Sequence, residues 1–270
     1  MNYRHAFHAG NFADLVKHAA LLQLLTRLKV AAKLTVIDTH AGRGLYDLAG
    51  AEARKSGEAA AGIVRLMAAA EAPLAFAPLT EAVRRLNGGG SVRRYPGSPW
   101  LIAEAIRPND SYVACELRPE EHGALAQALK GRANVRTLCA DGYDVAARET
   151  PGGRVLVLID PPFERADDYA RIVETAQAVR RRTAGAVLMI WLPLKDLATF
   201  DGFLADVEDA VAAPLVAECR IRPLTDPMKM NGCALVLLGA PAGLVAPLEA
   251  ICRWTAETLG ERGEARVYQA

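Results

Sequence analysis

Val155-Leu156-Val157-Leu158-Ile159-Asp160-Pro161-Pro162-Phe163 is the stretch of this 270-residue chain that decides its fold. The five residues before Asp160 are apolar and largely β-branched, a composition typical of a strand that is buried on both faces. Two prolines end that strand, because proline cannot donate a hydrogen bond to a central ladder. A helical pattern follows at 169–182. A buried strand followed by a helix predicts an α/β fold with a parallel sheet.

The four residues that end this strand also indicate a chemistry, namely the grip on a flat ring that carries an exocyclic amine. The Asp160 carboxylate would accept one N–H of the amine, and a carbonyl beside Pro161 or Pro162 would accept the other. The fixed φ of proline would hold that carbonyl in place, and Phe163 would stack on the ring. The alternative is that Pro-Pro only terminates the strand and that the aromatic belongs to the core.

Alternation of strands and helices extends over most of the chain. Helices are expected at 12–28, 99–106, 119–130, 169–182, 194–210 and 245–259, and strands at 34–37, 112–115, 135–139, 155–159, 186–191, 215–222 and 233–238. The last two strands have little helix between them and are expected to pair antiparallel. The other strands predict a doubly wound parallel sheet with right-handed crossovers.

Residues 47–96 interrupt this alternation. The segment is rich in alanine, has helical spacing at 59–70 and 79–86, and is punctuated by prolines and by Gly88-Gly89-Gly90. We therefore expect a single domain over 1–270 with a small helical subdomain inserted at 47–96. Residues 1–11 form a separate N-terminal motif in which aromatic and histidine side chains are unusually dense for a chain terminus.

The composition describes a globular chain without obvious special features. Lys and Arg number 32 and Asp and Glu 31, so the net charge of +1 gives only weak evidence for or against a nucleic-acid partner. The apolar stretches are too short for a membrane span and no apolar signal segment follows the N-terminus, so a cytoplasmic protein is expected. The five cysteines are scattered, which favours neither disulfides nor a metal site.

Acidic residues end four successive strands of the predicted sheet. They are Asp38, Glu116, Asp141 and Asp160. The carboxyl ends of parallel strands form one edge, where open α/β sheets bind ligands. Carboxylates are seldom buried without a partner, so a core role is a poor explanation for four of them. For Asp141 and Asp160 the competing explanation is a helix N-cap, but the set as a whole predicts a ligand site.

The chemistry at this edge fits S-adenosylmethionine better than a dinucleotide. The loop 38–44 lacks the spacing G-x-G-x-x-G, but its glycines let the backbone approach a ligand closely. An acid before those glycines suits an amine-bearing cofactor. Glu116 is then placed to accept the ribose hydroxyls, and Asp141 to accept an adenine amino group.

Three polar residues near this edge have alternative explanations. His40 lies inside the glycine loop and is the better candidate for a ligand contact. His18 would reach the ligand only if its helix folded back over the site, since a lone histidine is more often structural. Ser98 begins a predicted helix and could act only as its N-cap.

Five motifs carry a resemblance to a known family. They are Tyr3-Arg4-His5-x-Phe7-His8-Ala9-Gly10-Asn11, Lys17-His18, Asp38-Thr39-His40-Ala41-Gly42, Tyr95-Pro96-Gly97-Ser98-Pro99 and Asp160-Pro161-Pro162. On these motifs the chain resembles, over nearly its whole length, the RlmJ family of methyltransferases, which modify N6 of one adenine in 23S ribosomal RNA. The resemblance implies a Rossmann-like class I fold that uses S-adenosylmethionine, and 23S rRNA with an unstacked adenine as the partner.

The resemblance also implies roles for individual residues. Asp160 would engage the target amine together with Pro161, Pro162 and Phe163, and Tyr3 would act on the substrate side. Cofactor contacts would fall on His18, His40, Gly42, Ser98, Glu116, Asp141, Gly142 and Asp160. Relatives commonly carry tyrosine at the position of Phe163, so the stacking face is kept and a hydroxyl is lost. A monomer without a metal is expected.

Three other functions remain open at this point. The same grip would suit adenine in DNA or an amide in a protein, because each presents a planar amine. An NAD-dependent oxidoreductase would require the G-x-G-x-x-G spacing that is missing from the loop at 38–44. A non-catalytic RNA-binding module would not need the acids at the strand ends.

Overall fold

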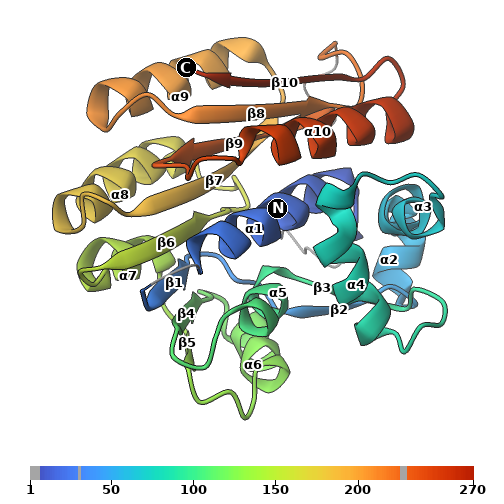
Figure 1. The fold of residues 1–270 in the computed structure, drawn as a ribbon, viewed down its shortest axis with the longest axis horizontal. Coiled ribbons are helices and arrows are strands. Elements are labelled where there is room, and N and C mark those ends of the chain that lie inside the picture. The colour runs from blue at the N-terminus through green and yellow to red at the C-terminus, as the bar shows by residue number, and fades with distance from the viewer. Residues whose placement is uncertain (1–6, 30–31, 226–229) are drawn as a thin grey trace.

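The strand predicted at 155–159 is β6 (Arg154–Ile159), and it lies inside an eight-stranded sheet. The structure is a computed structural model that describes residues 7–29, 32–225 and 230–270. The strand order is β10-β8-β9-β7-β6-β1-β4-β5 (Figure 1). Strands β7, β6, β1, β4 and β5 run parallel, whereas β9, β8 and β10 join them in antiparallel pairs. The predicted α/β class and the antiparallel pair near the C-terminus are confirmed.

Most of the remaining elements lie at the positions that the alternation of strands and helices predicts. The other strands of the sheet are β1 (Leu34–Asp38), β4 (Ser111–Cys115), β5 (Val135–Leu138), β7 (Val187–Leu194), β8 (Leu215–Arg220), β9 (Gly232–Leu238) and β10 (Glu264–Gln269). The helices outside the insertion are α1 (Phe12–Leu28), α5 (Ser98–Ala105), α6 (Pro119–Ala128), α7 (Gly142–Glu149), α8 (Asp168–Arg182), α9 (Leu197–Ala210) and α10 (Val245–Leu259).

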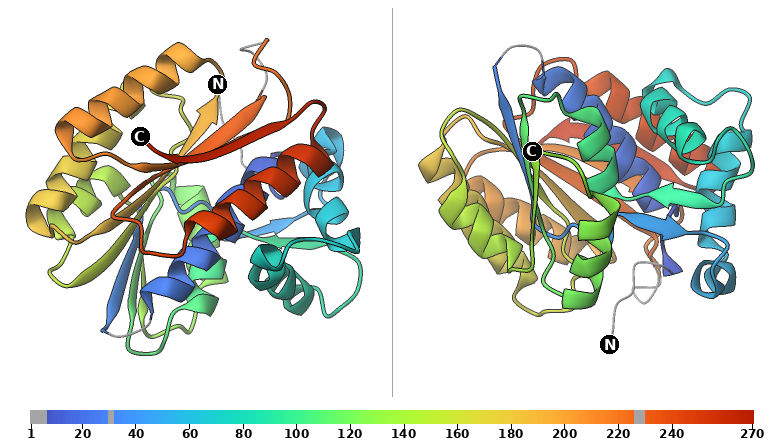
Figure 2. Two further views of the ribbon diagram at one scale, coloured as in Figure 1. Left: turned by 45° about the horizontal axis from the view of Figure 1, so that its top comes forward. Right: turned by 90° about the horizontal axis from the view of Figure 1, so that it is seen from below.

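Helices cover both faces of the sheet (Figure 2). Helices α1, α5 and α10 pack on one face and share its apolar core with the sheet. Helices α7, α8 and α9 pack side by side on the other face over a second core. This layering follows from the all-apolar strands of the centre, because a strand with two buried faces needs a cover on each side.

Helix α1 is buried almost all round. Leu15, Leu21 and Leu24 are completely shielded from solvent, and so is most of the rest of the helix. A helix that is apolar on every side belongs in a core. Its few polar residues near the N-terminus are therefore unusual, and they bear on the site described below.

Two short strands that pair with each other, β2 (Leu45–Asp47) and β3 (Arg94–Pro96), lie at the two ends of the segment 47–96. Its helical elements are α2 (Ala51–Ser56), the π-helix η2 (Ala60–Val64), α3 (Arg65–Ala68), the 3₁₀-helix η3 (Leu74–Phe76) and α4 (Ala77–Leu86). Both η2 and α4 pack against α1, so the insertion is joined to the helix that leads to the sheet (Figure 1).

Some predicted boundaries are wrong. Strand β7 continues to Leu194, because its last residues pair with the start of β9, where Leu194 lies opposite Gly232. Helix α9 therefore begins at Leu197 and not at Leu194. Helix α7, strand β10 and the β2–β3 pair were not expected from the sequence.

The described residues contain no helix with the length and apolar character of a bilayer span. All five cysteines are free thiols, four of them buried. Within the same ranges no three His, Cys, Asp or Glu side chains gather in a way that would hold a metal ion.

Candidate functional site

The four acids at the strand ends lie along one edge of the sheet. They follow β6, β1, β4 and β5, which are consecutive neighbours in the strand order. The residues Asp160, Asp38, Glu116 and Asp141 therefore succeed one another along that edge, as the sequence analysis expected of parallel strands. Their immediate surroundings differ, and those surroundings indicate what each can bind.

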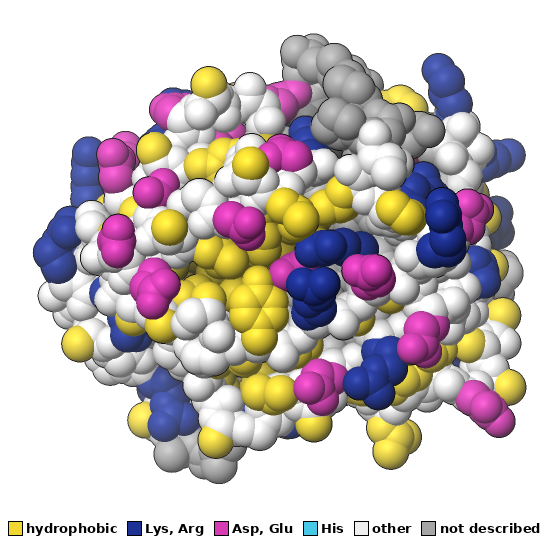
Figure 3. Space-filling model, turned by 90° about the horizontal axis from the view of Figure 1, so that it is seen from above, with side chains coloured by type: hydrophobic (Ala, Val, Ile, Leu, Met, Phe, Trp, Pro, Cys, Tyr) yellow, Lys and Arg dark blue, Asp and Glu magenta, His cyan; other side chains and the backbone are white. Residues whose placement is uncertain are grey.

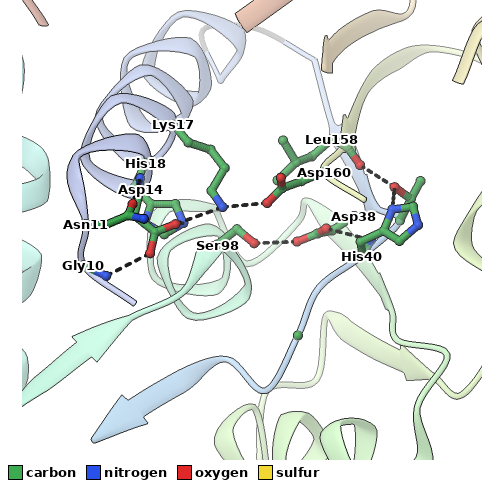
Figure 4. A network of polar contacts seen from close by, with 12 residues as sticks. Gly10, Asn11, Asp14, Lys17, His18, Asp38, His40, Ser98, Leu158 and Asp160 are labelled. Carbon is green, nitrogen blue, oxygen red and sulfur yellow. Dashed lines mark hydrogen bonds and ion pairs between the residues drawn. The ribbon is translucent and has the colours of Figure 1, made fainter. Parts of the chain in front are cut away.

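Lys17 is the closest partner of Asp160. Its Nζ lies 2.6 Å from Oδ2 of Asp160 and 3.0 Å from Oδ1 of Asp14, and the Lys17 side chain is only 6% exposed. The ring of Trp191 lies 5.9 Å from the same ammonium group. Figure 4 shows Lys17 reaching from α1 to the end of β6. Helix α1 thus delivers a cation to the predicted catalytic carboxylate.

From the sequence, Lys17 is part of a family motif and a hypothetical phosphate contact, and its pairing with Asp160 was not expected. A signal was available, because Asp14, Lys17 and His18 are buried charged or titratable residues in the first half of a helix that is otherwise apolar over most of its length. Charged side chains are rarely buried unless they are paired. Their spacing of three and four residues puts them on one face of the helix.

His18 is almost completely enclosed. Its Nδ1 lies 2.7 Å from the hydroxyl of Tyr95, and its Nε2 lies 4.0 Å from Oδ1 of Asp14. Burial raises the pKa of Tyr95 well above its ordinary value, so the hydroxyl keeps its proton and can donate it to Nδ1. His18 is therefore held between Tyr95 and Asp14, which also binds Lys17, and its contact with a cofactor stays a prediction.

Asp38 is the last residue of β1 and is fully buried at this edge of the sheet. Its Oδ2 accepts hydrogen bonds from the hydroxyls of Ser98, at 2.9 Å, and Tyr112, at 3.2 Å. Burial raises the pKa of Asp38 to about 7, and the two hydroxyl groups partly offset that rise. The N-cap of α5 is Gly97, so the alternative that Ser98 serves only as a cap is wrong. The Ser98 hydroxyl instead points toward Asp38 (Figure 4).

His40 belongs to the glycine loop, and in Figure 4 it lies on the far side of Asp38 from Lys17. Its Nδ1 is 2.7 Å from the Thr39 hydroxyl, which in turn donates to the carbonyl of Leu158. Burial lowers the pKa of His40 to about 4, so the ring is neutral near pH 7. Since the Thr39 proton is already donated, Nδ1 of His40 carries the ring proton, and Nε2 is left as a hydrogen-bond acceptor.

Asp141 caps the N-terminus of α7, because its Oδ1 accepts from the amide of Tyr143 at 3.0 Å. The capping alternative is therefore correct for this residue, but Asp141 also binds Arg171, whose Nη1 lies 2.9 Å from Oδ2. Burial alone would raise the pKa of Asp141, but the hydrogen bond and charge of Arg171 outweigh it and lower that pKa. Asp141 is thus an ionised acceptor near His40.

Close packing requires a glycine at position 142, in addition to the ligand contact predicted for this residue. A Cβ atom at this position would lie 1.9 Å from the carbonyl oxygen of Thr39. The start of α7 therefore approaches the loop after β1 as closely as a glycine allows.

Glu116 joins the end of β4 to the glycine loop. Its Oε2 accepts from the amide of Gly42 at 3.0 Å, and its Oε1 accepts from the amide of Arg118 at 2.8 Å. Burial raises the pKa of Glu116 above its ordinary value. Gly42 itself has a φ of +65°, which a residue with a side chain adopts only with strain. The loop is therefore held in a shape that brings backbone amides and a carboxylate together.

The Asp160–Phe163 corner has a strained backbone. Phe163 has a φ of +51°, which is a genuine outlier for a bulky residue and the kind of strain that gathers at functional sites. The centroid of its ring lies 5.0 Å from that of the Tyr169 ring and 6.1 Å from that of the Trp191 ring. The N-cap position of α8 is Asp167, so the capping alternative for Asp160 is wrong. Tyr3 lies outside the described residues, and its predicted role stays a prediction.

Comparisons with known proteins give consistent matches over most of the chain. The family described as "Ribosomal RNA large subunit methyltransferase D, RlmJ" matches residues 31–269. A ribosomal RNA large subunit methyltransferase J of Haemophilus influenzae is 33% identical, over 97% of this chain and 95% of that protein. The protein of the same name from Escherichia coli is 30% identical, over 94% and 92%.

A solved structure supports the same relationship at the level of the fold. A crystal structure of a Legionella pneumophila protein superimposes with a TM-score of 0.89 and 26% sequence identity. The superposition covers 97% of this chain and 98% of that one. This chain therefore shares nearly its whole architecture with that protein.

Proposed function

This chain belongs to the RlmJ family of ribosomal RNA large subunit methyltransferases, and from that premise we propose that it transfers a methyl group from S-adenosylmethionine to N6 of one adenine in 23S rRNA. The observation that carries the proposal is Asp160-Pro161-Pro162-Phe163 at the carboxyl end of a buried parallel strand, with Lys17 against the carboxylate. An rRNA substrate agrees with the expected cytoplasmic location.

The residues along the edge fit S-adenosylmethionine. Glu116 is a half-buried carboxylate beside the amide of Gly42, suited to the ribose hydroxyls. His40 Nε2 and Asp141 are acceptors close to each other, suited to the amino group of an adenine ring. When bound, the cofactor would supply an electrophilic methyl group. Its positive charge suits an edge that carries four acids.

Asp160 would hold the target amine. Lys17 engages Oδ2 of Asp160, so Oδ1 would accept one N–H of the amine while a carbonyl of Pro161 or Pro162 accepts the other. Two such bonds would favour a more tetrahedral and more nucleophilic nitrogen. The amine proton leaves readily once the nitrogen is alkylated, so no strong base is needed first. Most of the rate gain would come from orientation of the amine toward the methyl group.

Phe163 would cover one face of the adenine. Its strained backbone turns the ring against Tyr169 and Trp191, which hold it in place. The adenine must leave its stack to enter such a corner, and unstacking costs least in single-stranded or loosely paired RNA. Adenine in DNA or an amide in a protein would satisfy the same contacts, and the substrate test below separates these candidates.

The test is methyl transfer from labelled S-adenosylmethionine to protein-free 23S rRNA that lacks its native modifications. Wild type and an Asp206→Ala control, changed at an exposed site on α9, should label N6 of an adenine. Asp160→Ala should abolish labelling even at S-adenosylmethionine concentrations that saturate the variant in a calorimetric titration, because Asp160 is expected to contact both the amine and the cofactor. Transfer to a matched DNA oligonucleotide or to protein, with none to rRNA, would refute the proposed substrate. Light scattering during gel filtration would check the expected monomer.

A further inference from the structure

The insertion holds the few residues that precede α1. Glu58, between α2 and η2, accepts a hydrogen bond from Nδ2 of Asn11 at 2.9 Å. The same carboxylate lies 2.9 and 3.1 Å from Nδ1 of His8. Both partners are in the segment that enters α1. One side chain of the insertion therefore ties two residues of that segment, 47 and 50 positions away in sequence.

The backbone strengthens this junction. The amide of Ile63 donates to the carbonyl of Gly10 at 2.8 Å. Gly62 permits the approach, because a Cβ there would lie 2.2 Å from that same carbonyl oxygen. Both residues belong to the π-helix η2, a rare conformation that often marks a functional position. The insertion thus meets the start of α1 through a side chain, a main-chain hydrogen bond and a required glycine.

A continuous series of contacts leads from this junction to Asp160, the predicted catalytic carboxylate. Asn11 is the N-cap of α1, and its Oδ1 accepts from the amide of Asp14 at 3.0 Å. Asp14 accepts from the amide of Gly10 through Oδ2 and binds Lys17 through Oδ1. Lys17 then reaches Asp160 (Figure 4). The cap that Glu58 holds is therefore two contacts from the lysine that touches the predicted catalytic carboxylate.

We propose that Glu58 is a positioning residue for methyl transfer: by holding His8 and Asn11 it fixes the start of α1, and so places Lys17 against Asp160. The inference rests on the proposed function. Glu58 touches neither Asp160 nor any residue expected to hold the cofactor, and of that set only His18 lies on α1, so loss of Glu58 should lower kcat by a larger factor than it raises the KM for S-adenosylmethionine.

The first test compares Glu58→Ala, Glu58→Gln and the control Glu71→Ala, which changes an exposed acid of the same insertion. A misplacement of the catalytic group by about 1 Å costs about 10- to 100-fold in rate, so Glu58→Ala should lower kcat by about that factor. Glu58→Gln keeps a carbonyl that can accept from Asn11 and should recover part of the loss. Glu71→Ala should match wild type.

The pH profile separates a specific contact from a general loss of structure. The hydrogen bond to Glu58 raises the pKa of His8, although burial opposes the rise, and the charges of Glu58 and Asp14 add to it. The contact between His8 and Glu58 should therefore weaken as the pH rises through that elevated pKa. In wild type and in the Glu71→Ala control, kcat should therefore fall as the pH rises through the pKa of His8. In Glu58→Gln this fall should be absent.

Hydrogen exchange provides a readout that does not depend on turnover. In Glu58→Ala the amides of residues 10–18 and of Ile63 should exchange faster, while those of β6 keep their protection. Unchanged exchange, or faster exchange with unchanged kcat, would overturn the inference. If wild type methylates no RNA, the proposed function fails. In that case exchange at the Lys17 amide alone decides whether Glu58 positions α1.

Discussion

At the scale of single residues, Lys17 is the group on which most of the site depends. Its ammonium lies between the carboxylates of Asp14 and Asp160 and is nearly cut off from solvent. Removal of one partner from a buried ion pair leaves an uncompensated charge, which typically costs about 3–5 kcal/mol. We expect Lys17→Met to lower the free energy of unfolding by about 3 kcal/mol and to lower kcat as well.

Urea denaturation checks this prediction. The informative control is the double variant Lys17→Met with Asp160→Asn, because it removes a carboxylate that the single variant leaves unpaired. The double variant should recover part of the lost stability without recovering activity. Equal stability in the single and double variants would contradict the assigned pairing.

Asp38 predicts a pH dependence of stability. Burial raises its pKa to about 7 in the folded protein, whereas an unfolded chain releases this proton near 4. The contribution of this group to the free energy of unfolding should therefore fall as pH rises from about 4 to about 7, by at most about 4 kcal/mol, and stay constant above that.

Asp38→Asn is the variant that checks it. Urea denaturation of both proteins at several pH values should show the variant gaining on wild type between pH 4.5 and 7.5. A stability difference that does not change across this range would mean that Asp38 is ionised in the folded protein.

At this scale the placement of the acids along one edge could be predicted from the sequence, but their partners could not. The partner of Asp160 is 143 residues away in the chain, and no local pattern reports a contact of that separation. The strain at Phe163 was equally invisible, because a positive φ at a phenylalanine arises from its packing and not from its intrinsic preference.

At the scale of elements, the close approach of α7 to the loop after β1 is the most sensitive contact. A Cβ on Gly142 would lie 1.9 Å from the Thr39 carbonyl. Gly142→Ala should therefore push α7 away from His40 and weaken S-adenosylmethionine binding by about 10-fold or more, as expected for a displaced binding element.

The matched control is Gly123→Ala in α6, where a Cβ would meet nothing within 4 Å. This exposed helical glycine should gain about 0.5–1 kcal/mol on change to alanine. Thermal unfolding and a calorimetric titration of the cofactor would measure both effects. Unimpaired cofactor binding by Gly142→Ala would show that the α7 terminus does not form part of the site.

The prediction of elements succeeded where the apolar periodicity was strong and failed where pairing decided the outcome. Helices α1 and α10 begin and end where the pattern predicts. Strand β7 runs longer than expected because β9 extends beside it. Strand β10 was missed because it is a half-exposed edge strand whose sequence alternates charged and apolar residues. Such a strand becomes recognisable only once β8 is there to pair with it.

At the scale of the whole molecule, charge indicates where RNA would bind. Figure 3 looks onto the end of the molecule that carries β10 and α9, and Lys and Arg side chains there are interspersed with Asp and Glu around an apolar centre. In β8, the strand that pairs with β10, Arg220 forms an ion pair with Glu218. Arg93 and Arg94, by contrast, are exposed beside the β2–β3 pair that frames the insertion.

We therefore expect the double variant Arg93→Ala with Arg94→Ala to weaken RNA binding at every sequence tested. Each phosphate contact that is lost should lower the slope of log affinity against log salt by about 0.7–0.9. Arg266→Ala, at an exposed position of β10, is the control and should change neither quantity. Filter binding at several salt concentrations would measure them, and an unchanged slope in the double variant would exclude this surface.

The position of β1 in the sheet has a consequence for synthesis on the ribosome. The strand is made early, but it lies between β4 and β6, and its ladder with β6 needs residues 154–158. Pairings this distant form slowly. A nascent chain that ends before Arg154 leaves one side of β1 open and has no Asp160 for Lys17 to meet. The enzyme becomes competent only after more than half of it has been translated, so it cannot act on RNA while it is still a short nascent chain.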